Sequence, residues 1–384
     1  MSRKGALARL AVGSVALVLL LHSAFAADRP LIGIYTQDSP SSYSPSSYSR
    51  IPGSDAEYIA ASYAKLVESA GARPVPVSYN LGEEDLVNTL ESLDGFVFPG
   101  GGMDLSLNKT YAKSAQVVLE YAVKSGRDDF PVVGICLGFQ LISTVVSQTN
   151  GVLSAFDSSN LLERPSWVEG NYANSSLSQF YPPYSALKNL LVFENHHFGV
   201  SLDSFHADLS DFFDLLAIGK DRKGSPYVAA VEAKNHNIFG FQFHPEKNTY
   251  EWKASEVIPH DYSDLEVTRG VSKLLAYYSR GGSATGRGRR RTRMEDPRDE
   301  NAMVSGWSVG SRREREGWRP ETDWISLTFF LLPISLSLSL SRARACRQLI
   351  YNFPLVFTAP YSDESSFEQI YFFPKGQAPG RRRA

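Results

Sequence analysis

The sequence predicts an α/β fold of three layers, in which a doubly wound and mostly parallel sheet lies between helices on both of its faces. Two observations support this prediction. Short runs rich in β-branched and aromatic residues alternate with amphipathic helical stretches from residue 29 to residue 280. These runs are apolar along their whole length, which is typical of parallel strands that are buried on both faces of a sheet.

The expected elements follow one another in a regular order. Strands are predicted at 30–35, 73–80, 94–102 and 130–136, and helices at 54–71, 82–93 and 110–126, with another beginning near Leu137. Ser54 or Asp55 is the expected N-cap of the first helix. Further on, a mixture of strands and loops over the sheet edge is predicted at 150–235. A buried strand is predicted at 237–246, and a last helix at 262–279.

Residues 1–26 are predicted to be a secretory signal peptide. Lys4 and Arg9 form a positively charged region before an apolar core at 10–21, and Ala24-Phe25-Ala26 fits a cleavage site. A membrane anchor is the weaker interpretation, because the apolar run falls short of the roughly 20 residues that a spanning helix needs. The mature chain is therefore expected in an oxidising lumen, where unpaired structural thiols are uncommon.

The composition changes abruptly after residue 280. Residues 281–345 are charged, rich in glycine and aperiodic, so we expect them to be disordered. Within them the apolar stretch 325–340 is short and contains Pro333, so no stable membrane span is expected. The chain has 39 basic and 41 acidic side chains, and this balance gives no indication of a nucleic-acid partner.

A cysteine lies at the end of a strand in VVGICLGFQLI, residues 132–142. A nucleophile at a sharp strand-to-helix turn projects above the sheet, and the glycines on either side of Cys136 favour such a turn. The N-terminus of the following helix favours the thiolate, and the Leu137 N–H can face a developing oxyanion. Two alternatives remain open at this point. Cys136 is a buried structural cysteine, or it forms a disulfide with Cys346, since the chain has two cysteines.

The string FHPEK at 243–247 supplies the partners that a catalytic thiolate needs. His244 is the candidate base, and Glu246 is the candidate acceptor that orients the imidazole. In an extended segment both side chains point to the same side, and Pro245 stiffens that geometry. Histidine and acidic residues are otherwise too scattered for a zinc site, so no metal or other cofactor is expected.

Several motifs together resemble the class I glutamine-amidotransferase superfamily, which has a flavodoxin-like fold, and more narrowly the γ-glutamyl hydrolases. They are YIAASYAKLVESAGARPVPV, PGGGMD, GICLGFQ, NHHFGVS, FHPEKNTYEW and the late LIYNFPLVF…SSFEQIYFF. The resemblance implies a thiol hydrolase that cleaves γ-glutamyl amide bonds of folate polyglutamates and related γ-glutamyl peptides. It also implies a homodimer that is secreted or delivered to the lumen of a vacuole or lysosome.

The resemblance assigns roles to individual residues. It implies that Cys136 is the nucleophile, that His244 is the base and that Glu246 supports the base. It also maps His197 onto a further active-site histidine, whereas the adjacent His196 is expected to be structural.

Amide donors are expected to stabilise the oxyanion that forms when the Cys136 thiolate attacks the γ-glutamyl carbonyl. They come from Leu137 and from the turn at Gly101 and Gly102. Gln140 departs from the γ-glutamyl hydrolases, in which Glu is typical at this position, and resembles the glutaminases instead. Such a neutral amide changes the hydrogen bonding near the thiol.

The resemblance also divides the chain. The catalytic domain is expected at 27–280, followed by an insertion at 281–345 and by a segment at 346–384 that returns to the domain and ends in a basic tail. Because the insertion has no counterpart in the family, we hypothesise that it arises from a retained intron or an error in the gene model.

Some surface features have no assigned role. Asn108 and Asn174 begin N-glycosylation sequons and are the expected glycosylation sites. Arg164, Lys247 and Tyr250 are candidates for binding the glutamate α-carboxylate, although a structural or surface role is the default for each.

Two other functions fit part of the sequence. A glutaminase of the amidotransferase type is favoured by Gln140, but the signal peptide and the lack of a synthase domain in this chain argue against it. A non-catalytic secreted binding protein would retain the fold, but the Cys136, His244 and Glu246 set argues against it.

Overall fold

The fold was analysed in a computed structural model, which describes residues 29–39, 56–282, 350, 355–357 and 369–376. The predicted signal peptide, the insertion at 281–345 apart from its first two residues, and Cys346 lie outside the described residues, as does the basic tail. The described residues belong to one compact unit.

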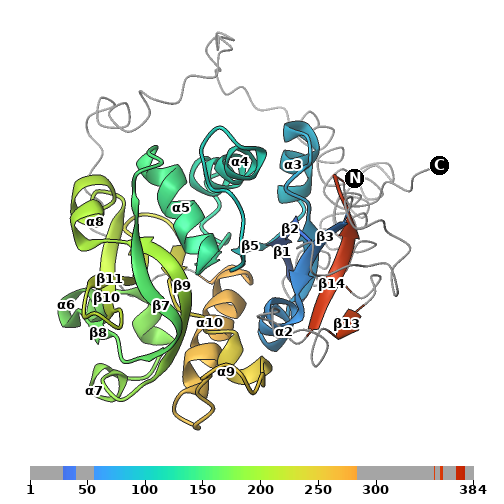
Figure 1. The fold of residues 1–384 in the computed structure, drawn as a ribbon. Coiled ribbons are helices and arrows are strands. Elements are labelled where there is room, and N and C mark those ends of the chain that lie inside the picture. The colour runs from blue at the N-terminus through green and yellow to red at the C-terminus, as the bar shows by residue number, and fades with distance from the viewer. Residues whose placement is uncertain (1–28, 40–55, 283–349, 351–354, 358–368, 377–384) are drawn as a thin grey trace, which may run out of the picture. The chain divides into compact units, whose positions relative to one another are not determined.

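A sheet of eight strands forms the centre of this unit (Figure 1). Five neighbouring strands are parallel, in the order β4 (Arg73–Val77), β1 (Leu31–Tyr35), β5 (Gly95–Phe98), β6 (Val132–Ile135) and β12 (Ile238–Phe241). Three antiparallel strands extend the sheet beyond β12, namely β11 (Pro226–Ala233), β10 (Phe213–Lys220) and β8 (Ser166–Trp167). The predicted mostly parallel sheet is confirmed.

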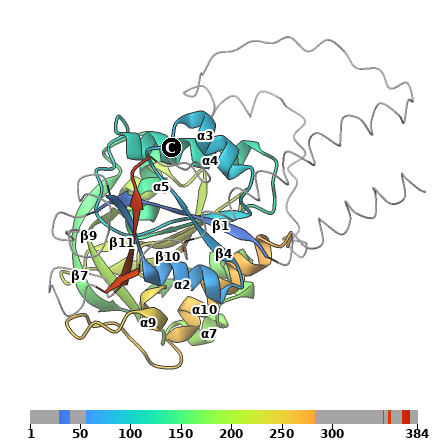
Figure 2. The same cartoon turned by 90° about the vertical axis from the view of Figure 1, so that its right-hand side faces the viewer.

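Helices cover both faces of the sheet (Figure 2). One face carries α2 (Ala61–Ser69) and α10 (Leu265–Tyr278), and the other carries α3 (Glu83–Leu90), α4 (Thr110–Lys124) and α5 (Leu137–Ser147). Alternate side chains of β1 enter the two cores: Ile32 and Ile34 pack into one, and Leu31 and Tyr35 into the other. This arrangement confirms the predicted doubly wound fold of three layers.

A second, antiparallel sheet joins distant parts of the sequence. Its order is β13 (Leu355–Phe357), β14 (Gln369–Pro374), β3 (Ala56–Ala60) and β2 (Gln37–Asp38). The predicted helix at 54–71 is therefore wrong in its first part: a strand precedes the helix, and Ala60 is the N-cap instead of Ser54 or Asp55. The physical reason is tertiary, because β3 has β14 on one side and β2 on the other (Figure 1).

Between β6 and β12 the chain builds a long two-stranded ribbon and short helices. The ribbon pairs β7 (Leu153–Glu163) with β9 (Val192–Val200). The short helices are α6 (Glu169–Asn174), η3 (Ser176–Gln179), α7 (Tyr184–Leu187) and α8 (Leu202–Asp208), and α9 (Lys247–Tyr250) follows β12. Among the helices in the described ranges, none combines the length and apolar character needed to cross a bilayer.

Candidate active site

Cys136 lies on a sharp turn between β6 and α5. Its backbone has φ 51° and ψ −109°, a positive φ that is uncommon for a residue with a side chain. The turn is fixed from two sides, because the Cys136 N–H donates to the Phe241 carbonyl of β12 at 2.7 Å and α5 packs tightly against β5. A Cβ on Gly138 would lie 2.0 Å from the Phe98 carbonyl oxygen, so only glycine permits this approach. The predicted strand-to-helix elbow is present.

His244 and Glu246 meet just beyond the end of β12. His244 Nδ1 lies 2.8 Å from Glu246 Oε1, and the two residues are 4% and 0% exposed. The expected extended geometry is wrong, because β12 ends at Phe241 and Glu246 has helical angles (φ −71°, ψ −26°) as the N-cap of α9. A turn, instead of a strand, brings the carboxylate back to the imidazole.

Gly100 shows how close the thiol and the imidazole are. A Cβ on Gly100 would lie 3.3 Å from the Cβ of Cys136 and 2.8 Å from Cε1 of His244. The carboxyl ends of β5 and β6 and the turn after β12 therefore converge on one point. The structure brings Cys136, His244 and Glu246 together at the edge of the sheet where parallel α/β folds place their ligand sites.

The electrostatics of this group favour a charged imidazole. Burial alone would lower the pKa of His244, because it removes water from the cation. The negative charges of Glu246 and of a Cys136 thiolate, with hydrogen bonds from the imidazole to both, outweigh burial and raise the pKa of His244 from 6.5 to about 10. The arrangement therefore favours a protonated imidazole at His244, next to the Cys136 side chain.

Tyr63 is part of the same centre, although no role was expected for it from the sequence. Its hydroxyl accepts a hydrogen bond from the Gly100 N–H at 2.8 Å. Burial raises the pKa of Tyr63 well above its usual value of 10, and the nearby charges of Glu246 and Cys136 raise it further. The hydroxyl therefore stays protonated and holds the turn after β5.

The three N–H groups expected to stabilise the oxyanion differ in whether they already have a hydrogen-bond partner. Leu137 is the first residue of α5, so its N–H has no partner within the helix. The Gly102 N–H donates to Gln37 Oε1 at 3.3 Å and is therefore engaged. The Gly101 N–H has no partner among the residues that the structure describes.

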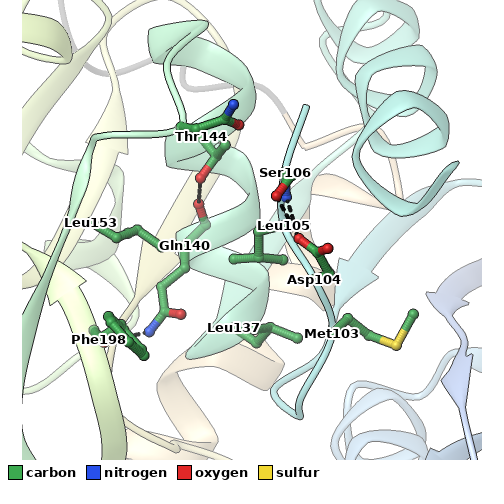
Figure 3. Close-up of a pocket in the computed structure, with 10 residues that line it drawn as sticks. Met103, Asp104, Leu105, Ser106, Leu137, Gln140, Thr144, Leu153 and Phe198 are labelled. Carbon is green, nitrogen blue, oxygen red and sulfur yellow. Dashed lines mark hydrogen bonds between the residues drawn. The ribbon is translucent and has the colours of Figure 1, made fainter. Parts of the chain in front are cut away.

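Gln140 links α5 to the ribbon instead of pointing at the thiol. Its Nε2 donates to the Phe198 carbonyl at 2.6 Å and lies 3.4 Å from Gln242 Oε1. With Leu137 it lines a cavity of about 410 Å³ next to the first turn of α5, which Figure 3 shows. The other lining residues are Met103, Asp104, Leu105, Ser106, Thr144, Asn150, Leu153 and Phe198. No arginine or lysine lines this cavity.

Strand β9 passes over the elbow. The carbonyl of Asn195, the first residue of the NHHFGVS motif, is 4.0 Å from Cys136 Sγ. His197, two residues on, is exposed, and its side chain points to the same side of the strand as that of Asn195. His196 points the other way and is buried between the Phe198 carbonyl at 2.9 Å and Glu194 Oε2 at 3.1 Å.

None of the remaining candidates lines the cavity next to α5. Lys247 is fully buried and forms an ion pair with Glu256 at 2.6 Å, and neither Arg164 nor Tyr250 lines the cavity. Asn108 and Asn174, the two sequon asparagines, are exposed. Within the described ranges, no group of three or more histidine, cysteine, aspartate or glutamate side chains could hold a metal ion.

Comparison with known proteins relates the chain to a family. The family model described as Peptidase C26 matches residues 30–246, a span that includes Cys136, His244 and Glu246. "Gamma-glutamyl hydrolase 1" from Arabidopsis thaliana is 37% identical over 231 residues, which cover 58% of this chain and 65% of that protein. "Gamma-glutamyl hydrolase" from Homo sapiens is 34% identical over 258 residues, which cover 65% of this chain and 78% of that protein.

The match is partial in length. The chain spans 65% of the Arabidopsis relative, slightly less than two thirds. Among solved structures, a glutamine amidotransferase from Thermotoga maritima has a TM-score of 0.40 at 14% identity and covers 65% of this chain and 98% of its own. The sheet topology of this chain itself defines its fold. Because the family model matches more than half of the chain, the chain belongs to the Peptidase C26 family.

Proposed function

We propose that the protein is a cysteine-type γ-glutamyl hydrolase that cleaves folate polyglutamates and related γ-glutamyl peptides. The observation that carries this proposal is the meeting of Cys136, His244 and Glu246 on one sheet edge, with a charged imidazole favoured beside the thiol. The names of the curated relatives support the γ-glutamyl bond as the target. The family resemblance supports the folate polyglutamate as the substrate.

The proposed reaction proceeds through a thioester. The Cys136 thiolate attacks the γ-carbonyl carbon, and the carbonyl electrons move to oxygen as the C–S bond forms. The imidazolium of His244 gives its proton to the leaving amine as the C–N bond breaks. A water molecule then loses a proton to His244 and attacks the thioester, which releases the γ-glutamyl acid and restores the thiolate.

Other residues support the reacting groups in this proposal. Glu246 holds the imidazole tautomer through Nδ1 and stabilises its charge. The N–H groups of Leu137 and Gly101 stabilise the oxyanion, and one such donor is typically worth about 3–4 kcal/mol. His197, on the same side of β9 as Asn195, is proposed to contact the substrate. We further propose a homodimer that enters the secretory route and works outside the cell or in a vacuolar or lysosomal lumen.

The test is hydrolysis of folate pentaglutamate by residues 27–384, followed by separation of the products by chain length. We expect shortened folates from the wild type under reducing conditions and none from Cys136→Ala. Cys346→Ala is the matched control, and it should keep wild-type activity with and without reductant. Activity in Cys136→Ala equal to the wild type would refute the assignment.

The same assay separates the alternative functions. Free glutamine is offered in parallel with the γ-glutamyl substrate. Release of ammonia from glutamine, with no cleavage of the polyglutamate, would identify a glutaminase. Binding of folate polyglutamate without cleavage of either substrate would identify a non-catalytic binding protein.

A further inference from the structure

The turn at 99–102 is held by the side chain of Gln37, a residue that no sequence motif singled out. Gln37 lies on β2 and is 2% exposed. Its Nε2 donates to the Gly100 carbonyl at 3.0 Å and to the Pro99 carbonyl at 3.4 Å, and its Oε1 accepts from the Gly102 N–H at 3.3 Å. One amide group therefore contacts both sides of the glycine turn.

The hydrogen-bonding capacity of this amide is fully used. A glutamine side chain offers two donor hydrogens and an oxygen with two lone pairs. Both hydrogens go to the turn, and the Tyr58 hydroxyl on β3 donates to Gln37 Oε1 at 3.4 Å, beside the Gly102 amide. A flipped amide would set its NH₂ group against the Gly102 N–H, which can only donate, and its oxygen against the Pro99 and Gly100 carbonyls. The turn itself therefore fixes the orientation of the Gln37 side chain, and the Tyr58 hydroxyl adds a further donor to its oxygen.

The amide and the turn are in direct contact at Gly101. A Cβ on this glycine would lie 1.8 Å from Gln37 Oε1. The Gly100 N–H is taken by Tyr63 and the Gly102 N–H by Gln37. Within the described part of the chain, the Gly101 N–H is thus the one amide of the three without a hydrogen-bond partner, and the neighbouring Gly100 lies against the catalytic pair.

We infer that Gln37 is a positioning residue: its amide holds the 99–102 turn so that the Gly101 N–H faces the oxyanion at the carbonyl that Cys136 attacks. This inference rests on the proposed function for the nature of that carbonyl. Gln37 and Tyr58 belong to the second sheet, in which β14 pairs with β3. The second sheet therefore sets part of the active-site geometry, and a displacement of about 1 Å in such a group can cost about 10²-fold in rate.

The test compares two reactions of the same thiol. In acylation by p-nitrophenyl acetate, the thiolate attacks the ester carbonyl, the C–S bond forms, the C–O bond breaks and p-nitrophenolate leaves. This step passes through an oxyanion. In alkylation by iodoacetamide, the thiolate displaces iodide at a saturated carbon, and no oxyanion forms. The ratio of the two rates therefore reports the oxyanion donors separately from the reactivity of the thiol.

Three variants and one control are needed. Gln37→Leu keeps the bulk of the side chain but removes every hydrogen bond. Tyr58→Phe removes the hydroxyl that donates to the amide oxygen. Gln37→Glu keeps the shape and adds a carboxyl group that can donate only when it is protonated. Gln116→Leu is the matched control, because Gln116 lies on α4 and its amide donates to Glu120 at 3.0 Å, outside this network.

The expected result for Gln37→Leu is a loss of about 10²-fold in the acylation rate, with alkylation changed by less than about twofold. Tyr58→Phe should show a smaller loss in the same direction, and Gln116→Leu should show none. With the γ-glutamyl substrate, the loss in Gln37→Leu should fall on kcat and leave KM nearly unchanged, because the oxyanion forms only during reaction.

Gln37→Glu adds a pH-dependent measurement, which separates a positioning role of this residue from a purely structural one. When ionised, the introduced carboxylate would face the Pro99 and Gly100 carbonyls with an acceptor, and its burial there would raise its pKa. The acylation-to-alkylation ratio should therefore approach that of the wild type below this pKa. It should fall as the pH rises through it.

Several outcomes would overturn the inference. These are equal losses of acylation and alkylation in Gln37→Leu, no loss of either, or no measurable acylation of the wild type. Failure of the proposed function looks different: the polyglutamate stays intact, while the acetate ester still acylates Cys136 in a manner that depends on Gln37.

Discussion

Replacing Glu246 with glutamine tests the electrostatic basis of the candidate site. The amide keeps the shape of the carboxylate, and its oxygen can still accept from His244 Nδ1, so the change removes mainly the charge. In the wild type, the charges of Glu246 and Cys136 raise the pKa of His244 from 6.5 to about 10 against the opposing effect of burial. At about 1.4 kcal/mol per unit of pKa, this difference corresponds to about 5 kcal/mol, to which both anions contribute.

The balance between burial and the nearby negative charges sets the direction in which the pKa of His244 should change in Glu246→Gln. Without the carboxylate, burial continues to disfavour the imidazolium, and the pKa of His244 should fall from about 10 toward 6.5. The proton that the leaving amine needs is then missing at neutral and alkaline pH. The alkaline limb of the kcat profile for γ-glutamyl hydrolysis should therefore move down in pH in Glu246→Gln.

The same shift affects stability. A histidine with a raised pKa in the folded state contributes stability that is fully present below about 6.5 and is lost as the pH rises through about 10. In Glu246→Gln this contribution is reduced, so the decline of the free energy of unfolding between these pH values should become flatter.

The pKa itself can be measured by ¹⁵N NMR of the histidine rings. The chain has seven histidines, so a His244→Asn spectrum is needed to assign the resonance. Glu120→Gln serves as a control, because Glu120 pairs with Lys124 on α4. If the His244 ring titrates at the same pH in wild type and Glu246→Gln, and the alkaline limb of the rate stays in place, the electrostatic argument is refuted.

Two further predictions concern the scaffold. In Gly138→Ala, the added Cβ would lie 2.0 Å from the Phe98 carbonyl oxygen, so α5 must move away from β5; urea denaturation should show a loss of about 1–3 kcal/mol or more, and an unchanged midpoint would contradict the contact. Glu57 is buried and accepts hydrogen bonds from Thr36, Ser78 and Asn80, yet burial raises its pKa overall. The wild type should therefore lose stability as the pH rises through that raised pKa, whereas Glu57→Gln should not, and parallel stability curves would be evidence against this account.

The sequence was a good guide wherever local pattern decides the structure. The apolar runs that became β1, β5 and β6 and the periodic stretches that became α3, α4 and α5 were predicted close to their observed positions. The elbow at Cys136 was also predictable, because the glycines around it report the close approach of helix and strand.

Long-range pairing set the limit of sequence-based prediction. Residues 56–60 continue a helical pattern but form β3, because β14 from the other end of the chain pairs with them. The contact between His244 and Glu246 was expected across an extended segment, whereas a turn forms it. In each case, a partner or a bend decided the geometry that the local pattern left open.

The polar contacts around the site were also hidden from the sequence. No role was expected for Gln37 or Tyr58 from the sequence, and the role inferred for them arises only because β2 and β3 bring them to the turn after β5. Tyr63 has the spacing of a core residue, and its hydroxyl becomes part of the site only where it meets the Gly100 amide.

The most direct test of the central claim is trapping of the covalent intermediate. The wild type is mixed with a γ-glutamyl substrate, quenched in acid within milliseconds and digested, and the peptide that contains Cys136 is weighed by mass spectrometry. The account predicts a mass increase equal to the acyl group on Sγ of Cys136, which disappears as turnover ends. Substrate cleavage with the acyl group on another residue would contradict the account. So would cleavage without any adduct at any time, in an enzyme whose deacylation has been slowed.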